Sequence, residues 1–237
     1  MNIQEWLYNL SFFPKKKISE VDVCQIQQHL IKVFKEMGIP KNIKIDNGRP
    51  FGDPQMELIT PLVLWLTGMG INIIRNRPKR PTDNAVVERS QGVMGKWTEY
   101  KKCKNTDELQ SRLLREAKFH NFHFPIRRKG NKTRIELYPN MQKTQTRWKA
   151  SNFELKKVLD LMAKGSWERK VSSNGQIGFY GQRFSVGQKY RHQIVSIKLN
   201  TAQNKWFIYD ASGVLIKKRS SPFCIENIWK LDFSQNA

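Results

Sequence analysis

The sequence has 237 residues and carries 42 Lys and Arg against 20 Asp and Glu, a formal net charge of +22 with an isoelectric point near 10.1. This excess of positive charge predicts a polyanionic partner, and nucleic acid is the first candidate. A basic membrane-surface protein is disfavoured, because we find no apolar run of about 18 residues, no signal peptide and no long basic amphipathic helix. We expect a soluble protein of two domains with no membrane partner.

The cysteine and histidine residues predict neither a disulfide framework nor a zinc site. Cys24, Cys103 and Cys224 are odd in number and widely spaced, which fits a reducing cytosol. His120 and His123 stand three residues apart on a predicted helix and could share a face as metal ligands. Because no second ligand pair lies nearby, we interpret them as helix-surface or core histidines.

The first half of the chain predicts alternating strands and helices. The predicted elements are, in order, a strand over residues 1–13, a helix from Ser19 to Met37, a strand over 42–45, a buried helix over 58–66, a strand over 71–74, a helix capped by Thr82 or Asp83 that carries Glu88, and a helix over 107–124. The strand over 42–45 delivers Asp46 to its carboxyl end, where Asn47 and Gly48 turn the chain. This alternation predicts a layered α/β domain.

The second half changes from basic to β-rich. Residues 125–149 contain eight Lys and Arg residues and a single acid, Glu136. This composition predicts a linker or arm that contacts phosphate groups; the alternative is a basic surface that is merely solvated. A short helix over 153–163 follows. Short β-rich pieces separated by turns then predict a small barrel or sandwich, at residues 176–180, 182–186, 193–199, 205–209 and 214–216.

Asp46 and Glu88 are the candidate metal ligands. Two carboxylates that reach one cleft from different elements repel each other unless a cation neutralises them, and a divalent metal ion is the simplest such cation. Two hydrated Mg²⁺ or Mn²⁺ ions about 3.5 to 4 Å apart would activate an attacking water or 3′-hydroxyl and stabilise the leaving oxygen. The residues alone leave open that Asp46 is an ordinary turn acid and Glu88 a helix-surface acid.

Three segments, in this order, resemble a known family. Residues 45–52 (IDNGRPFG), 62–71 (LVLWLTGMGI) and 77–89 (RPKRPTDNAVVER) resemble the second half of the catalytic core of DDE-type transposases and integrases of bacterial insertion sequences, which are retroviral-integrase-like enzymes. Residues 167–187 are similar to the small C-terminal β-barrel of such integrases. The resemblance implies an α/β ribonuclease H-like core, incomplete at its N-terminus, over residues 1–125, a basic linker over 126–165 and a small all-β SH3-like barrel over 166–237.

The resemblance implies that Asp46 and Glu88 are catalytic ligands of a two-metal Mg²⁺ or Mn²⁺ site, weak or absent here. Asn47 and Gly48 match the turn that shapes the site, and Asn84 lies one helical turn before Glu88. We expect DNA contacts from basic residues near that helix, in the linker and on the barrel: Arg75, Arg77, Lys79, Arg80, Lys96, Arg127, Arg128, Lys129, Lys217, Lys218 and Arg219. For the last three the alternative is that any small barrel in a basic protein could show such cations.

The sequence departs from the family upstream of Asp46. Only 45 residues precede Asp46, fewer than the resemblance implies between the first and second acids, and neither Glu5 nor Asp22 is a convincing stand-in. The N-terminal helix-turn-helix of the family is absent as well. We therefore expect the chain alone to be catalytically impaired.

Two functions remain open. The first is a transposase or integrase for DNA integration and transposition, which in the intact family cuts and joins DNA strands with a metal ion. The second is a non-catalytic DNA-binding remnant that modulates an intact transposase. A nucleic-acid packaging protein would not explain the acidic motifs. The resemblance implies transposon ends and target DNA as partners, a homo-oligomer or an association with an intact transposase, and a location in the bacterial cytoplasm at the nucleoid.

Overall fold

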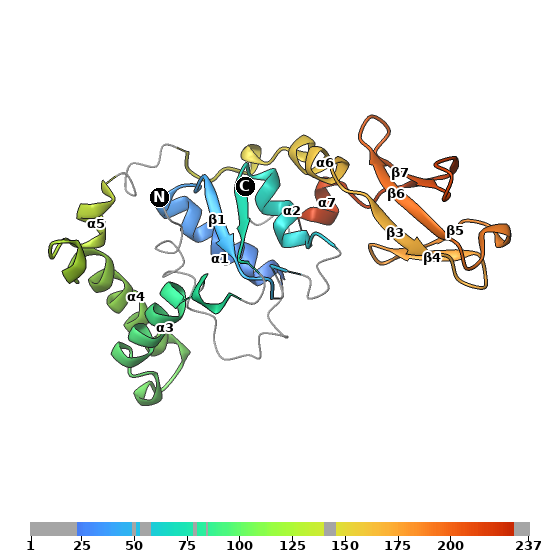
Figure 1. The fold of residues 1–237 in the computed structure, drawn as a ribbon. Coiled ribbons are helices and arrows are strands. Elements are labelled where there is room, and N and C mark those ends of the chain that lie inside the picture. Colours follow the sequence, from blue (N-terminus) through green and yellow to red (C-terminus); the bar gives the residue numbers. More distant parts are fainter. Residues whose placement is uncertain are drawn as a thin grey trace. The chain divides into compact units, whose positions relative to one another are not determined.

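The computed structural model describes residues 23–48, 51–52, 58–77, 80–83, 85–139 and 146–229. These residues form a mixed α/β structure, with helices and a small parallel strand pair followed by an antiparallel four-stranded sheet (Figure 1). The chain divides into two compact units, Met1–Pro54 with Ile71–Ala150 and Gln55–Gly70 with Ser151–Ala237. Within the described ranges, no helix has the length and apolar character needed to cross a membrane.

The described part of the first unit begins with the predicted amphipathic helix, α1 (Val23–Met37). Its apolar positions Ile26, Leu30, Val33 and Phe34 are buried, which confirms the predicted face. The helix is followed by Gly38 at a φ of 88°, a left-handed conformation that glycine adopts without Cβ strain. The predicted strand over 1–13 and the cap at Ser19 lie outside the described residues.

A parallel strand pair follows. β1 (Asn42–Ile45) pairs with β2 (Asn72–Arg75), in a register that sets Asn42 opposite Asn72 and Ile45 opposite Arg75. The ladder continues one step further, because the Asn76 N–H donates to the Ile45 oxygen at 2.9 Å. Parallel strands end at the same edge, so Asp46 and Asn76 leave the sheet side by side. β1 has the predicted bounds, and β2 lies one residue further along than predicted.

Helices complete the first unit. They are η4 (Pro81–Asp83), α3 (Ala85–Trp97), η5 (Tyr100–Lys102) and α4 (Thr106–Phe122). The predicted helix over 107–124 is confirmed with slightly different ends, because Asn105 caps it by accepting a hydrogen bond from Glu108 N at 2.8 Å. Met94 on α3 and Ala117 on α4 are buried against each other, with Trp97 packed beside them.

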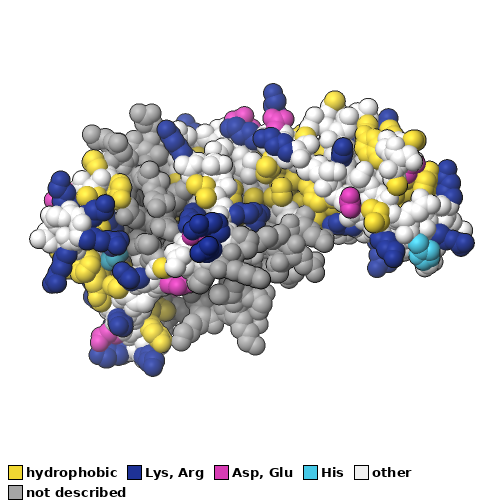
Figure 2. Space-filling model, in the orientation of Figure 1, with side chains coloured by type: hydrophobic (Ala, Val, Ile, Leu, Met, Phe, Trp, Pro, Cys, Tyr) yellow, Lys and Arg dark blue, Asp and Glu magenta, His cyan; other side chains and the backbone are white. Residues whose placement is uncertain are grey.

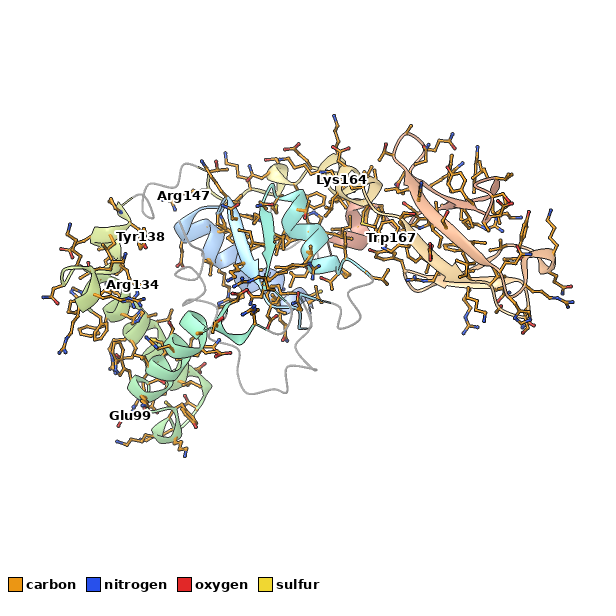
Figure 3. The ribbon with its side chains drawn as sticks, viewed as in Figure 1. Glu99, Arg134, Tyr138, Arg147, Lys164 and Trp167 are labelled. Carbon is orange, nitrogen blue, oxygen red and sulfur yellow. The ribbon has the colours of Figure 1, made fainter. Side chains whose placement is uncertain are left out.

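The predicted basic arm is partly folded onto this unit. It contains η6 (Arg127–Lys129) and α5 (Arg134–Leu137), whose start is closed by a reciprocal capping box between Thr133 and Glu136. Arg134 lies where α5 meets α4 (Figure 3) and donates from Nη1 to the His120 oxygen at 2.9 Å.

Residues 146–148 return to the end of α1. Arg147 (Figure 3) donates from Nη1 to the main-chain oxygens of Lys35 and Glu36, at 2.8 and 2.9 Å. The Lys35 ammonium lies 5.1 Å from the ring centroid of Trp148. Arg147 therefore satisfies carbonyl groups that the end of a helix leaves without intrahelical partners.

The second unit contains an apolar helix, α2 (Pro61–Gly68), together with η8 (Ala150–Asn152), α6 (Leu155–Ala163) and α7 (Ile225–Ile228). The predicted helix over 58–66 begins at Pro61, because Thr60 is extended and accepts a hydrogen bond from Val63 N as its cap. Residues 62–66 are all buried. Gly68 lets the chain pack closely, since a Cβ there would lie 2.1 Å from the Phe153 ring.

The β-rich region of this unit forms two sheets. β3 (Trp167–Lys170), β6 (Ile194–Asn200), β7 (Lys205–Tyr209) and β8 (Leu215–Ser220) form an antiparallel sheet in the order β3-β6-β7-β8. β4 (Gln176–Phe179) and β5 (Gln182–Ser185) form a separate hairpin, and η9 (Gln188–Tyr190) follows. Each of the five predicted strands has a counterpart, although β8 ends four residues later than predicted and β3 was not predicted. The predicted small barrel is not borne out as a closed barrel, because the sheet strands among the described residues form an open sheet and a separate hairpin.

The core of this region combines aromatic and aliphatic side chains. Trp206 and Ile208 of β7 and Ile197 of β6 are fully buried. The Tyr180 hydroxyl accepts from Ile59 N at 3.1 Å and lies 3.2 Å from the Ile59 oxygen, to which it can donate. These contacts attach the turn after β4 to the segment that leads into α2.

Candidate carboxylate site and nucleic-acid interface

The turn after β1 exposes the Asp46 carboxylate. Gly48 N donates to Asp46 Oδ1 at 3.1 Å, and Gly52 N donates to the Gly48 oxygen at 2.7 Å. A Cβ at Gly52 would lie 2.2 Å from the Asn47 oxygen, so only glycine fits this loop. Asp46 is therefore oriented by its own turn while it stays open to solvent.

Asn47 joins the two parallel strands at the same edge. Its Nδ2 donates to the Asn76 oxygen at 3.0 Å, across the edge where β1 and β2 end. This bond ties the turn after β1 to the end of β2.

Asp83 connects this edge to the helix that carries Glu88. Lys44, two residues before Asp46, donates from Nζ to the Asp83 oxygen at 3.0 Å. Arg77 donates to the Asp83 carboxylate from its main-chain N (3.0 Å), from Nε (3.1 Å) and from Nη2 (2.7 Å). These donors hold the pKa of Asp83 well below its usual range.

The sequence indicated Asp83 only as a possible helix cap. In the structure η4 includes Asp83, and α3 begins at Ala85. The only sequence signal for the ion pair is the presence of an acid and Arg77 on opposite sides of a proline-rich turn. Arg77 was expected to contact DNA, and its guanidinium is engaged by Asp83 while its side chain is 69% exposed.

Glu88 lies in the first turn of α3 and is exposed. A carboxylate is favourable there because the amino end of a helix carries partial positive charge. Glu88 and Asp46 thus belong to the same unit. Asp46 follows Lys44 and Glu88 follows Asp83, and the Lys44–Asp83 hydrogen bond joins the two segments. The predicted site residue Asn84 and the predicted DNA contact Lys79 lie outside the described residues.

The metal-ligand chemistry of this edge is partial. In the described part of the chain, no group of three or more His, Cys, Asp and Glu side chains is placed to hold a metal ion. Asp46 and Glu88 are exposed oxygen donors, and Mg²⁺ commonly takes one or two carboxylates and keeps several waters.

The two histidines near the end of α4 have different environments. His120 is 2% exposed, and burial together with the charge of Arg134 lowers its pKa to about 4. His123 is exposed and stacks on Phe119, with ring centroids 5.9 Å apart. One is a core histidine and the other a surface histidine, which agrees with their interpretation from the sequence.

The remaining predicted DNA contacts near α3 lie at the surface. Arg75 ends β2, Arg80 precedes η4, and Lys96 lies in the last turn of α3; all three are exposed. Arg127, Arg128 and Lys129 form η6 and are exposed as well. Lys and Arg side chains outnumber Asp and Glu side chains on the visible face (Figure 2).

The three cations of β8 do not share one face. Lys218 is exposed, whereas Lys217 and Arg219 are half-buried, because alternate residues of a strand point to opposite sides. Arg219 donates from Nη2 to the Ser185 oxygen at 3.1 Å.

Lys218 instead belongs to a row of side chains that crosses three strands. Lys198 of β6 pairs with Phe207 of β7, and Phe207 pairs with Lys218. The Lys218 ammonium lies 4.8 Å from the Phe207 ring centroid, in cation–π geometry. We call Lys198, Phe207 and Lys218 the cation–aromatic row; sequence reasoning missed Lys198 and Phe207, because only the strand register brings them together.

No known protein-family model matches the chain.

Proposed function

We propose that the chain is a transposase/integrase core-domain protein of the DDE type that binds DNA and, through Asp46 and Glu88, a divalent metal ion. The observation that carries the proposal is the Lys44–Asp83 hydrogen bond, 3.0 Å long, which joins the strand that precedes Asp46 to the segment that leads to Glu88. We interpret the parallel β1–β2 pair as part of a ribonuclease H-like core. The proposal keeps the division into residues 1–125, 126–165 and 166–237.

The second unit supports a DNA-binding role. The antiparallel sheet and the β4–β5 hairpin are interpreted as an SH3-like barrel, and the cation–aromatic row lies on the outward face of that sheet. Ammonium groups attract phosphates, and an aromatic ring between them offers a surface for a base. The cation–aromatic row contains no carboxylate, so DNA binding through it would not depend on Asp46 or Glu88 and would remain in a chain that has lost catalysis.

At the carboxylate edge, the residues would orient a hydrated metal ion. Asp46 and Glu88 would each supply an oxygen, the Gly48 N–H would hold the Asp46 carboxylate, and Asn47 would hold the turn. A bound Mg²⁺ or Mn²⁺ supplies polarisation of a phosphate oxygen and activation of a nucleophile. Two carboxylates offer fewer anionic ligands than a two-metal site needs, so we expect weak metal binding and impaired strand transfer.

Metal binding can be tested directly with Mn²⁺, whose paramagnetic resonance spectrum distinguishes free from bound ion. We expect Asp46→Asn and Glu88→Gln each to weaken Mn²⁺ binding by the purified chain. Asp107→Asn is the matched control, because Asp107 is an exposed acid in the first turn of α4 in the same unit. Equal Mn²⁺ binding by all three variants would refute the metal site.

A Mg²⁺-dependent strand-transfer assay separates the two functions. We expect little or no joining by the chain alone. Robust joining that Asp46→Asn abolishes would refute the impaired-enzyme proposal and identify an active transposase. DNA binding that survives both acid substitutions, with inhibition of an intact transposase when the two are mixed, would identify the non-catalytic remnant.

A further inference from the structure

A cavity of about 270 Å³ lies among four helical segments of the first unit, α3, α4, η6 and α5. It is lined by Ala85, Arg89, Ser90, Val93, His120, Phe124, Arg128 and Arg134. α3 supplies the first four, the end of α4 and the following turn supply two, and η6 and α5 supply one arginine each. Neither the carboxylate edge nor the cation–aromatic row contributes a residue.

The cavity lies on a different face of α3 from Glu88. Ala85, Arg89 and Val93 are spaced four residues apart and therefore share a helix face. At 100° per residue, Glu88 falls about 100° from the centre of that face. The cavity is thus a candidate site separate from the proposed metal site, and the two can be tested independently.

The charge of the cavity is positive. Arg89, Arg128 and Arg134 line it, and no Asp or Glu is among the described residues that do so. Arg134 is only 9% exposed, so solvent screens its charge weakly. Guanidinium groups match the geometry of phosphate oxygens, which makes a phosphate the expected anion.

One wall of the cavity is aromatic. The Phe124 and His120 rings stack with centroids 5.9 Å apart and an interplanar angle of 10°. Trp97 packs edge-on against both, at 4.9 Å from Phe124 and 5.7 Å from His120. Because burial lowers the pKa of His120 to about 4, its ring is neutral at pH 7 and adds no charge to this wall.

We propose that this cavity binds a single nucleotide, with its phosphate on the arginines and its base against Phe124. The volume is close to the lower end of ligand pockets, about 300 to 1,000 Å³, which suits one nucleotide unit better than a large coenzyme. Two sources share this chemistry: a free nucleotide, or an unpaired terminal nucleotide of a DNA strand. Binding of a DNA end at this cavity rests on the proposed function, whereas binding of a free nucleotide does not.

The first test is calorimetry with the full chain and three probes: deoxyadenosine 5′-monophosphate (dAMP), deoxyadenosine and inorganic phosphate. We expect dAMP to bind more tightly than either fragment, because only dAMP engages both the arginines and the aromatic wall. Equal or weaker binding of dAMP than of both fragments would overturn the proposal.

Variants locate the site. Arg89→Gln and Arg128→Gln should each weaken dAMP binding about tenfold, the effect of losing one charge-assisted hydrogen bond. Lys118→Gln is the matched control, because Lys118 is an exposed cation of α4 that does not line the cavity. Phe124→Leu should reduce dAMP binding and leave phosphate binding unchanged. Arg134 is left intact because its hydrogen bond to the His120 oxygen supports the fold.

The last test distinguishes the sources. We compare binding of a blunt duplex with that of a duplex ending in one unpaired 5′-phosphorylated nucleotide. If the chain prefers the unpaired end, and Arg128→Gln removes this preference while Lys118→Gln keeps it, the ligand is the DNA end. Binding of dAMP without such a preference assigns a free nucleotide. Loss of dAMP binding to the same extent in Lys118→Gln and Arg128→Gln would overturn the site. Absence of all DNA binding with dAMP binding intact would contradict the proposed function only.

Discussion

Lys44 donates a hydrogen bond from its ammonium group to the main-chain oxygen of Asp83, 3.0 Å away. The two residues are 39 positions apart in the sequence, and the bond links a β-strand to the turn that begins the helix carrying Glu88. Asp83 also forms an ion pair of 2.7 Å with Arg77, so the same residue contacts both the β1 strand and the residues that follow β2. The geometry of the candidate carboxylate edge therefore depends on Asp83 as well as on the two proposed ligands.

The Asp83 carboxylate should make this segment sensitive to acid. The folded-state pKa of Asp83 is lowered, chiefly by hydrogen bonds from Arg77, so its stabilising contribution is present above the unfolded pKa of about 3.9 and is lost as the pH falls below it. We expect Asp83→Asn to lower Tm at pH 7. The difference in Tm from the wild type should shrink as the pH falls from about 4 toward 2. A difference that stays constant over this pH range would contradict the role of the ion pair.

His120 should contribute a second, milder acid sensitivity. Its folded pKa is about 4 because of burial and the nearby Arg134 charge, whereas the unfolded value is about 6.5. The unfolded state therefore binds more protons between these values, and stability falls as the pH decreases from about 6.5 to 4. The loss should be on the order of 3 kcal/mol.

Chemical denaturation at several pH values measures this effect. His120→Phe keeps an aromatic ring beside Phe124 and should flatten the pH dependence between about 6.5 and 4. His123→Phe is the control, because His123 is exposed, and it should retain the wild-type slope. An unchanged slope in His120→Phe would show that another group controls acid sensitivity.

Two glycines should respond in opposite directions to the same substitution. A Cβ at Gly68 would lie 2.1 Å from the Phe153 ring, whereas a Cβ at Gly92 of α3 would meet nothing within 4 Å. We expect Gly68→Ala to destabilise the fold by about 1 to 3 kcal/mol through overpacking. Gly92→Ala should stabilise it by about 0.5 to 1 kcal/mol through helix propensity. Denaturant unfolding of the two variants checks both signs, and a neutral Gly68→Ala would contradict the close packing.

The cation–aromatic row should determine part of the salt dependence of DNA binding. If Lys198 and Lys218 each contact a phosphate, Lys198→Gln and Lys218→Gln should each reduce the slope of log K against log salt by about 1. Phe207→Leu should weaken single-stranded DNA binding and leave that slope unchanged. Lys164 (Figure 3), exposed just after α6, provides the control Lys164→Gln. An equal change of slope in the control would mean that the effect is one of net charge alone.

Much of the secondary structure could be predicted from the sequence. The periodic apolar residues of α1, the alternation in β1 and the bounds of β7 are local patterns, and the structure has all three. The start of α2 was missed by three residues because the Thr60 cap and Pro61 outweigh the apolar pattern. The sequence predicted Lys217, Lys218 and Arg219 as surface cations after a strand that ends at residue 216. In the structure β8 continues through all three, so alternate residues point to opposite sides of the sheet.

The sequence by itself determined which segments become helices and strands, where Asp46 leaves its strand, and that the surface is strongly basic. These properties depend on residues within a few positions of one another. Only the tertiary structure decided that Lys44 reaches Asp83, that Lys198 and Lys218 flank Phe207, and that three arginines surround one cavity. Such contacts join residues far apart in the chain, and they depend on strand register and helix packing, which many residues determine together.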